Sequence, residues 1–207
     1  MTGIISDNVG RTSGLIKAAA GGGGVWTLIK TLTASASATL SFVNGTAYVV
    51  LDSTYPIYVF KFINCHPATD NTSLMFNMST DSGSNYNVTK TTTFFNALHT
   101  ENDATAYAAY QTGVDLAQST SNAYLMAGIG NNNDDNGNGE LFLFNPSSTT
   151  FVKHFIFTSA RNAAVAVNDF VSGYGNTTSA INAVQFSMAS GNIDAGKIKL
   201  YGLKDSA

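Results

Sequence analysis

The chain of 207 residues is long enough to bury a sizeable core, and 44% of its residues are hydrophobic while only 11% are charged. A net charge of −3 supplies no basic footprint for a phosphate backbone, which argues against nucleic-acid binding. The single cysteine cannot close an internal disulfide, and no apolar run approaches the roughly 18 residues of a membrane span. Uncharged polarity replaces charge, with 21 Asn, 20 Ser and 24 Thr. We expect a folded protein without a membrane partner.

Residues 1–24 differ in composition from the rest of the chain. Apolar residues in the first 20 positions follow neither a helical nor a strand period, and the glycines at 21–24 form a flexible joint because glycine lacks a Cβ. We predict an arm with its joint at 1–24 and a body at 25–207. A frayed terminus and an arm that becomes ordered on another subunit both remain open. In the second case the contact residues are Ile4, Ile5, Val9, Arg11, Leu15, Ile16 and Lys17.

The start of the chain, MTGIISDNVGRTSG, lacks the charged-then-apolar order of a secretory signal. This favours a chain that begins near Met1 and is made in a cytoplasm.

The body has the pattern of short strands separated by turns. The expected strands are residues 26–33, 38–43, 47–51, 55–63, 74–78, 87–95, 140–144, 151–158, 164–171, 183–188 and 197–203. Only residues 100–118 carry helix formers in number, so we expect at most one short helix. Regular spacing with Gly, Asn, Asp and Ser between strands predicts an all-β, antiparallel β-sandwich.

Aromatic residues in the most apolar of these strands are the candidates for the core. We expect most of the following set to be largely buried: Trp26, Phe60, Phe62, Phe142, Phe155 and Phe186.

The search for catalytic and metal-binding patterns is negative. The histidines at 66, 99 and 154 show no zinc spacing, and neither a nucleophile elbow nor a phosphate-binding loop occurs. Cys65 and His66 are adjacent, so on a strand they point to opposite faces. His99, Glu101 and Asp103 are typical of a solvated corner. We therefore predict no catalytic site, no metal site and no cofactor.

The stretch 131–140, NNNDDNGNGE, has many side-chain oxygens that could bind calcium. Aligning it with an EF-hand loop places Leu143 where the bidentate glutamate belongs, so a solvated hairpin tip is the favoured interpretation. Exposed tyrosines beside Asn and Asp are typical of carbohydrate sites, although tyrosines packed on a sandwich edge are more common. The residues expected to form a possible ligand-facing loop are Tyr107, Tyr110, Asn133, Asp134 and Asp135.

Both ends of the chain resemble structural proteins of tailed-phage virions. The resemblance is carried by the arm GIISDNVGRTSGLIKAA, the entry into the body at VWTLIKTLTAS, and the ending INAVQFSMASGNIDAGKIKLYGLK. It implies a virion component, made in the host cytoplasm, with a particle-bound arm and a jelly-roll-like domain.

Two placements on a virion follow from this resemblance. A capsid decoration or cement protein would bind the major capsid protein through its arm and stabilise the assembled particle. A fibre or adhesin would attach to a tail or neck protein and present loops to a host glycan or surface protein. We favour decoration, because one domain without coiled-coil or shaft repeats is short for a complete fibre. The expected assembly is a closed homo-oligomer, with a trimer as the favoured form.

Overall fold

The computed structural model describes residues 25–205, so the predicted arm and its seven contact residues lie outside the described part of the chain. Within the described residues the chain forms strands and no helix. The strands are β1 (Trp26–Thr33), β2 (Thr39–Val43), β3 (Ile57–Pro67), β4 (Thr72–Ser79), β5 (Lys90–Thr100), β6 (Ala106–Tyr110), β7 (Ala123–Ile129), β8 (Gly137–Phe144), β9 (Lys153–Asn162), β10 (Val165–Gly175), β11 (Ala183–Met188) and β12 (Ile193–Leu203).

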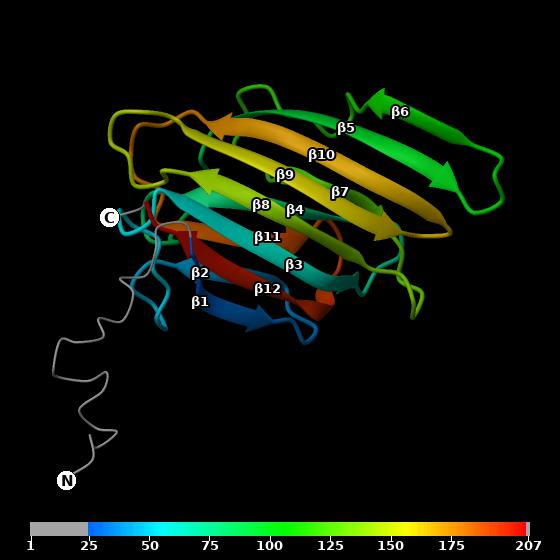
Figure 1. The fold of residues 1–207 in the computed structure, drawn as a ribbon, viewed down its shortest axis with the longest axis horizontal. Coiled ribbons are helices and arrows are strands. Elements are labelled where there is room, and N and C mark those ends of the chain that lie inside the picture. The colour runs from blue at the N-terminus through cyan, green and yellow to red at the C-terminus, as the bar shows by residue number, and fades with distance from the viewer. Residues whose placement is uncertain (1–24, 206–207) are drawn as a thin grey trace, which may run out of the picture.

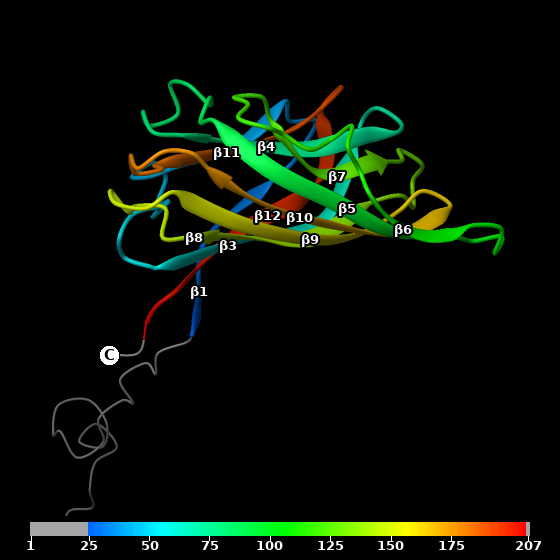
Figure 2. The same ribbon diagram turned by 90° about the horizontal axis from the view of Figure 1, so that it is seen from above.

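The strands form two antiparallel sheets that pack face to face (Figure 1). The larger sheet has eight strands in the order β1-β12-β3-β8-β9-β10-β5-β6, and the smaller has four in the order β2-β11-β4-β7. Figure 2 shows the two layers, with β4, β7 and β11 above and β3, β8, β9 and β10 below. The predicted all-β sandwich is confirmed.

Eight of the strands wind as a jelly roll. The pairs are nested: β1 with β12, β2 with β11, β3 with β8, and β4 with β7. Contacts between β12 and β3 and between β11 and β4 then complete two four-stranded sheets. This is the arrangement of a long hairpin folded over on itself, which is how a jelly roll buries one face of each sheet.

The remaining four strands extend one sheet of the jelly roll. Strands β5 and β6 are inserted between β4 and β7, and β9 and β10 are inserted between β8 and β11. Both insertions join the larger sheet beyond β8, in the order β9-β10-β5-β6. We call these four strands the sheet extension. Its far edge, β6, projects past the smaller sheet (Figures 1 and 2).

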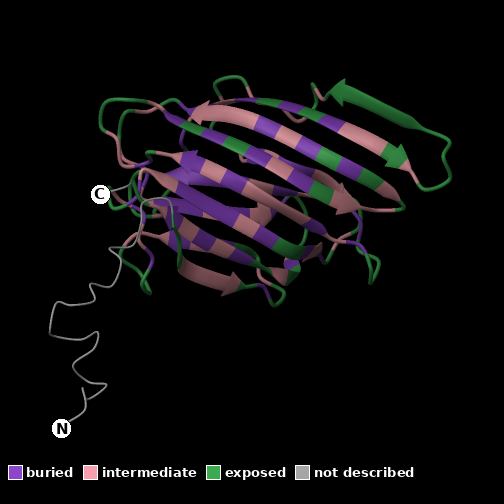
Figure 3. Ribbon diagram, viewed as in Figure 1, coloured by how far each residue is buried: buried purple, intermediate pink, exposed green. Residues whose placement is uncertain are grey.

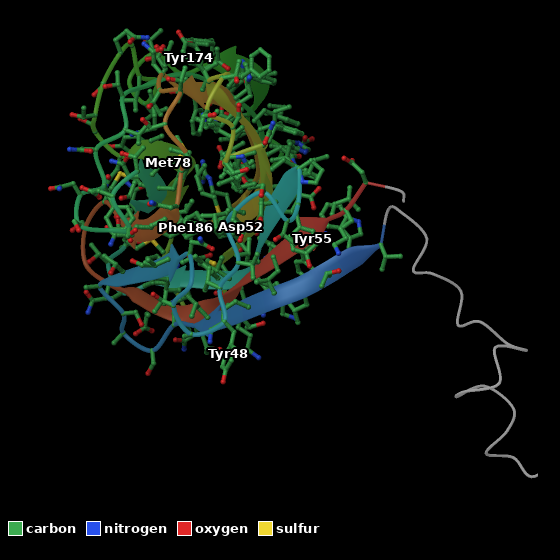
Figure 4. All side chains as sticks on the ribbon, turned by 90° about the vertical axis from the view of Figure 1, so that its left-hand side faces the viewer. Tyr48, Asp52, Tyr55, Met78, Tyr174 and Phe186 are labelled. Atoms are coloured by element: carbon green, nitrogen blue, oxygen red, sulfur yellow. The ribbon has the colours of Figure 1, made fainter. Side chains whose placement is uncertain are left out.

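Aromatic rings fill the space between the sheets. Phe186 on β11 lies 5.2 Å from Phe60 and 5.1 Å from Phe62, centroid to centroid, and both contacts are edge-to-face. Phe76 and Phe42 contact the same ring from neighbouring strands. Phe186 and Met78 point between the sheets in Figure 4, which also shows Tyr48 on the outside. The core therefore centres on Phe186.

The prediction that most of the six aromatic residues are buried is confirmed, with two exceptions. Phe60, Phe62, Phe155 and Phe186 are buried. Trp26 is 41% exposed and Phe142 is only partly buried, because both lie on the outer face of the larger sheet and not between the layers.

Three local predictions differ from the structure. Residues 106–110 form strand β6 and not a helix, since pairing with β5 outweighs the weak helix preference of an Ala-rich segment. Residues 47–51 form turns and irregular structure, where Ala47 and Tyr48 have positive φ angles that an extended strand does not allow. Strand β7 was absent from the predicted set because its sequence, AYLMAGI, contains few β-branched residues.

Candidate contact surface on the larger sheet

The outer face of the larger sheet carries exposed aromatic and aliphatic side chains among polar ones, and no second layer covers it in residues 25–205. Alternate residues along each strand point outward. Those on the extension include Ile156 on β9 and Phe95 on β5, which are 48% and 45% exposed. Trp26 contacts Phe142 and Tyr201 at the other end of the same face. Sheets with one solvated face normally carry polar residues there, so this face is a candidate contact surface.

Two aromatic pairs on the extension border a shallow trough. Phe95 and Phe170 stack with centroids 4.9 Å apart and planes 10° apart. His154 and Tyr174 lie 6.0 Å apart on the neighbouring strands. The His154–Tyr174 pair lines a depression of about 470 Å3, and Phe170 lies two residues along β10 from its Ser172. The residues that line it are Thr91, Thr92, Thr93, His154, Phe155, Ile156, Ser172, Gly173 and Tyr174.

The trough offers hydroxyl and amide groups as well as rings. The hydroxyls of Thr93 and Ser172 lie 2.8 Å apart. At the Tyr174 end, the Gln118 amide donates to Thr91 Oγ1 at 2.8 Å and to the Tyr174 hydroxyl at 3.3 Å. Asn176 donates to Gln118 Oε1 at 2.8 Å, which holds that amide in place. Rings flanked by fixed amides and hydroxyls suit a neutral polar ligand.

Charged residues are absent from the trough but not from the rest of the outer face. None of the residues that line the trough is an acid, a lysine or an arginine. Nearer to β1, Lys61 forms an ion pair with Glu140 at 3.0 Å and lies 6.0 Å from the Trp26 ring. Lys199 lies directly across from Lys61 on β12 and forms no ion pair among the described residues, so positive charge remains at this end of the face.

Potentially reactive side chains elsewhere in the described chain are buried or bonded to other protein groups. Cys65 is buried, and desolvation raises the pKa of its thiol to about 12, so a thiolate nucleophile is disfavoured. His99 Nε2 lies 2.9 Å from Asp103 Oδ1 at an exposed turn, as expected of a solvated corner. Residues 25–205 contain no group of three His, Cys, Asp or Glu side chains that could hold a metal ion.

The Asn-rich stretch is not a hairpin tip. Residues 131–136 connect β7 in the smaller sheet to β8 in the larger one, and 137–140 belong to β8 itself. Asp135 is buried, with Oδ2 accepting from Asn132 and Oδ1 from Asn162. Its carboxylate is therefore already used to fix the connection between the sheets.

The five residues expected to form one ligand-facing loop lie in two places. Tyr107 and Tyr110 are on the edge strand β6, whereas Asn133, Asp134 and Asp135 lie in the loop before β8. Three strands separate β8 from β6 in the sheet. At the usual spacing this is roughly 19 Å, so these residues do not form a single site.

Two lysines are buried at one end of the sandwich. Lys90 and Lys153 both lie opposite Gly175 in the sheet. Lys90 Nζ donates to Asn77 Oδ1 and to the carbonyl of Val88, both at 2.6 Å, and Lys153 Nζ donates to the carbonyl of Phe151 at 2.6 Å. Desolvation lowers the pKa of both groups, that of Lys90 from 10.5 to about 8. Both ammonium groups therefore donate their hydrogen bonds to uncharged oxygens.

Stability should depend on pH through Lys90. Between pH 8 and 10.5 the folded protein loses this proton while the unfolded chain keeps it, so the unfolded state binds more protons and stability rises with pH. We expect the unfolding free energy of the wild type relative to Lys90→Met to increase by about 3 kcal/mol across this window. Urea denaturation of both proteins at several pH values measures the difference. A pH-independent difference would contradict the lowered pKa.

Family models, curated proteins and solved structures provide no match to this chain. Among the described residues, no helix is long and apolar enough to span a membrane.

The trough residues were not among the sequence-predicted sites. A signal was present, because Phe95 follows the buried Phe94, and Ile156 lies between the buried Phe155 and Phe157. Strands that are apolar on both faces indicate either a second covering layer or a contact surface.

Proposed function

We propose that the chain is a non-enzymatic structural protein of a tailed-phage virion, and that its sandwich makes contacts through the outer face of the larger sheet. In the form we favour, it is a capsid decoration or cement protein that binds the assembled particle through residues 1–24. The virion assignment is supported by the resemblance of both chain ends to such proteins. The contact role is supported by the uncovered aromatic face.

The exposed aromatic side chains of the outer face are the observation that carries the contact role. Exposed aromatic side chains are costly to leave in water and gain free energy when a partner covers them. Trp26, the first residue of β1, lies opposite Leu203 at one edge of the sheet. The arm would therefore leave the body at the edge opposite to the extension, so that arm and extension contact different neighbours.

Burial and hydrogen bonding of the potentially reactive side chains support a non-enzymatic role. The Cys65 thiol is buried with a raised pKa, and Asp135 and Asp169 are buried and bonded to protein donors. A glycan hydrolase needs two positioned carboxylates beside its substrate. No acid lines the trough.

Deleting residues 1–20 should leave the body folded and abolish attachment to particles. The first described strand begins at Trp26, so the core and both sheets lie outside the deleted segment. We expect an unchanged melting temperature and loss of the protein from sedimented virions. The full-length protein should stay bound when the salt concentration is raised to about 1 M, because Asp7, Arg11 and Lys17 are the only charged residues in the segment.

Two outcomes would contradict this assignment. Loss of the cooperative melt on truncation would contradict the separation of arm and body, and salt-induced release would contradict apolar attachment. Counting copies per virion separates decoration, with hundreds of copies, from a neck or tail position with a few to a few dozen.

A fibre or adhesin that binds a neutral host glycan is the second candidate. It is favoured by the trough, which His154 and Tyr174 line, and by the hydrogen-bonded amide of Gln118 that contacts the Tyr174 hydroxyl. A low copy number, together with binding of the full chain to an uncharged glycan, would select this function over decoration.

A further inference from the structure

Strand β6 is the last strand of the larger sheet. All five of its residues are exposed, and they are coloured accordingly in Figure 3. Among the described strands it pairs with β5 alone. An open edge of this kind is a template for a further strand unless charge, proline or a bulge protects it.

The two edges of the larger sheet differ in this protection. Strand β1 has a register shift between Leu28 and Lys30, and Lys30 places a charge in the strand. Strand β6 has the sequence AYAAY and pairs with β5 in unbroken register, without a charged residue or proline. The β6 edge therefore lacks the charge, proline and bulge that commonly protect an edge.

The backbone groups that face away from β5 follow from the hydrogen-bond pattern. Gln111 N donates to the carbonyl of Phe94 at 2.8 Å, and Thr100 N donates to the carbonyl of Thr105 at 3.0 Å. In an antiparallel pair, hydrogen-bonded residues alternate along the strand. Odd-numbered residues from 105 to 111 therefore bond to β5. Ala106, Ala108 and Tyr110 direct their N–H and C=O groups outward.

The sequence of β6 is complementary to itself about Ala108. A two-fold axis at this residue pairs Ala108 with Ala108 of a second copy, and Ala106 with Tyr110. These are the outward-facing residues, and each pair can exchange two backbone hydrogen bonds. On the opposite face Tyr107 lies across from Ala109. Each large ring is thus opposed by a small residue, and no charges face each other within the strand.

We propose that β6 pairs antiparallel with β6 of a second copy, so that two larger sheets form one continuous sheet across a two-fold axis. The proposal does not depend on the virion assignment. Such a two-fold contact is isologous and closes as a dimer. The trimer expected from the family resemblance would need a different surface. Because the axis is perpendicular to the sheet, both troughs would lie on the same side of the dimer and could bind one multivalent partner.

Cysteine cross-linking tests the register. In the full-length chain, Ala108→Cys places two thiols on residues whose Cα atoms are about 5.5 Å apart, within disulfide range. We expect mild oxidation to produce a covalent dimer. The matched control is Ala106→Cys, which is equally exposed but lies opposite Tyr110 and should remain uncross-linked. Cys65 is buried and present in both variants. Equal cross-linking of the two cysteine variants, or no cross-linking of Ala108→Cys, overturns the proposed register of the β6–β6 pair.

A proline variant tests the hydrogen bonding. Because Ala108 N points away from β5, Ala108→Pro removes the central donor of the dimer contact and spares the β5–β6 bonds. Sedimentation equilibrium should show that Ala108→Pro raises the dissociation constant of the dimer at least about tenfold. Ala108→Ser, which keeps the N–H, should behave as wild type. A wild type that remains monomeric at high concentration, or an assembly that Ala108→Pro leaves unchanged while the fold is intact, overturns the proposal.

Discussion

Replacing Phe186 by alanine is expected to lower the unfolding free energy by about 3–5 kcal/mol. The ring is fully buried and contacts four other phenylalanines, which come from both sheets. Its removal leaves a cavity that rigid neighbouring rings cannot fill. For a chain of this size the melting temperature should fall by roughly 10 °C. Chemical and thermal denaturation followed by circular dichroism measure both quantities.

Phe95→Ala is the matched control for Phe186→Ala. The same side chain is removed, but Phe95 is 45% exposed and loses mainly its stacking on Phe170. We expect a loss of about 1 kcal/mol. Equal destabilisation by the two variants would show that the core does not centre on Phe186.

Replacing Arg161 by methionine is expected to cost about 3–5 kcal/mol, because it leaves a buried carboxylate without its cation. Arg161 Nε lies 2.9 Å from Asp169 Oδ2, and its Nη1 donates to the carbonyl of Gly128 at 2.7 Å. Asp169 is completely buried, and its Oδ1 has no hydrogen-bond partner among the described residues. In the variant, only the Ser159 hydroxyl at 3.2 Å remains to bind Oδ2.

Two measurements identify the buried charge as the cause. The double variant Arg161→Met with Asp169→Leu removes both charges and should recover most of the lost stability. Burial already raises the pKa of Asp169, and loss of the arginine raises it further. The folded variant then binds the Asp169 proton more tightly than the unfolded chain does. The unfolding free energy that the variant has lost relative to wild type should therefore decrease as the pH falls through the raised pKa of Asp169. A deficit that is the same at all pH values and in the double variant would indicate lost packing instead.

Sequence periodicity was a good guide to the strands of the jelly roll. Strand β11 was predicted with its observed bounds, and β1 likewise, because alternation of apolar with Thr or Ser residues is a local property. The edge strand β6 was not predicted. Its Ala-rich sequence has no intrinsic β preference, and it becomes a strand only because the neighbouring β5 offers a free edge.

The candidate surface could not be predicted from local sequence patterns. The sequence by itself determined an all-β protein with an aromatic core, and it indicated the absence of motifs for catalysis. It could not say which face of a doubly apolar strand is covered. Phe142 and Phe155 have the same local pattern, yet Phe155 points between the sheets and Phe142 points outward. That choice depends on which face of the larger sheet the smaller sheet covers, as the contact of Phe155 with Phe76 of the smaller sheet shows. The extension then brings Phe95, Phe170 and Tyr174 together on an uncovered face, because strands distant in sequence become neighbours only through sheet pairing.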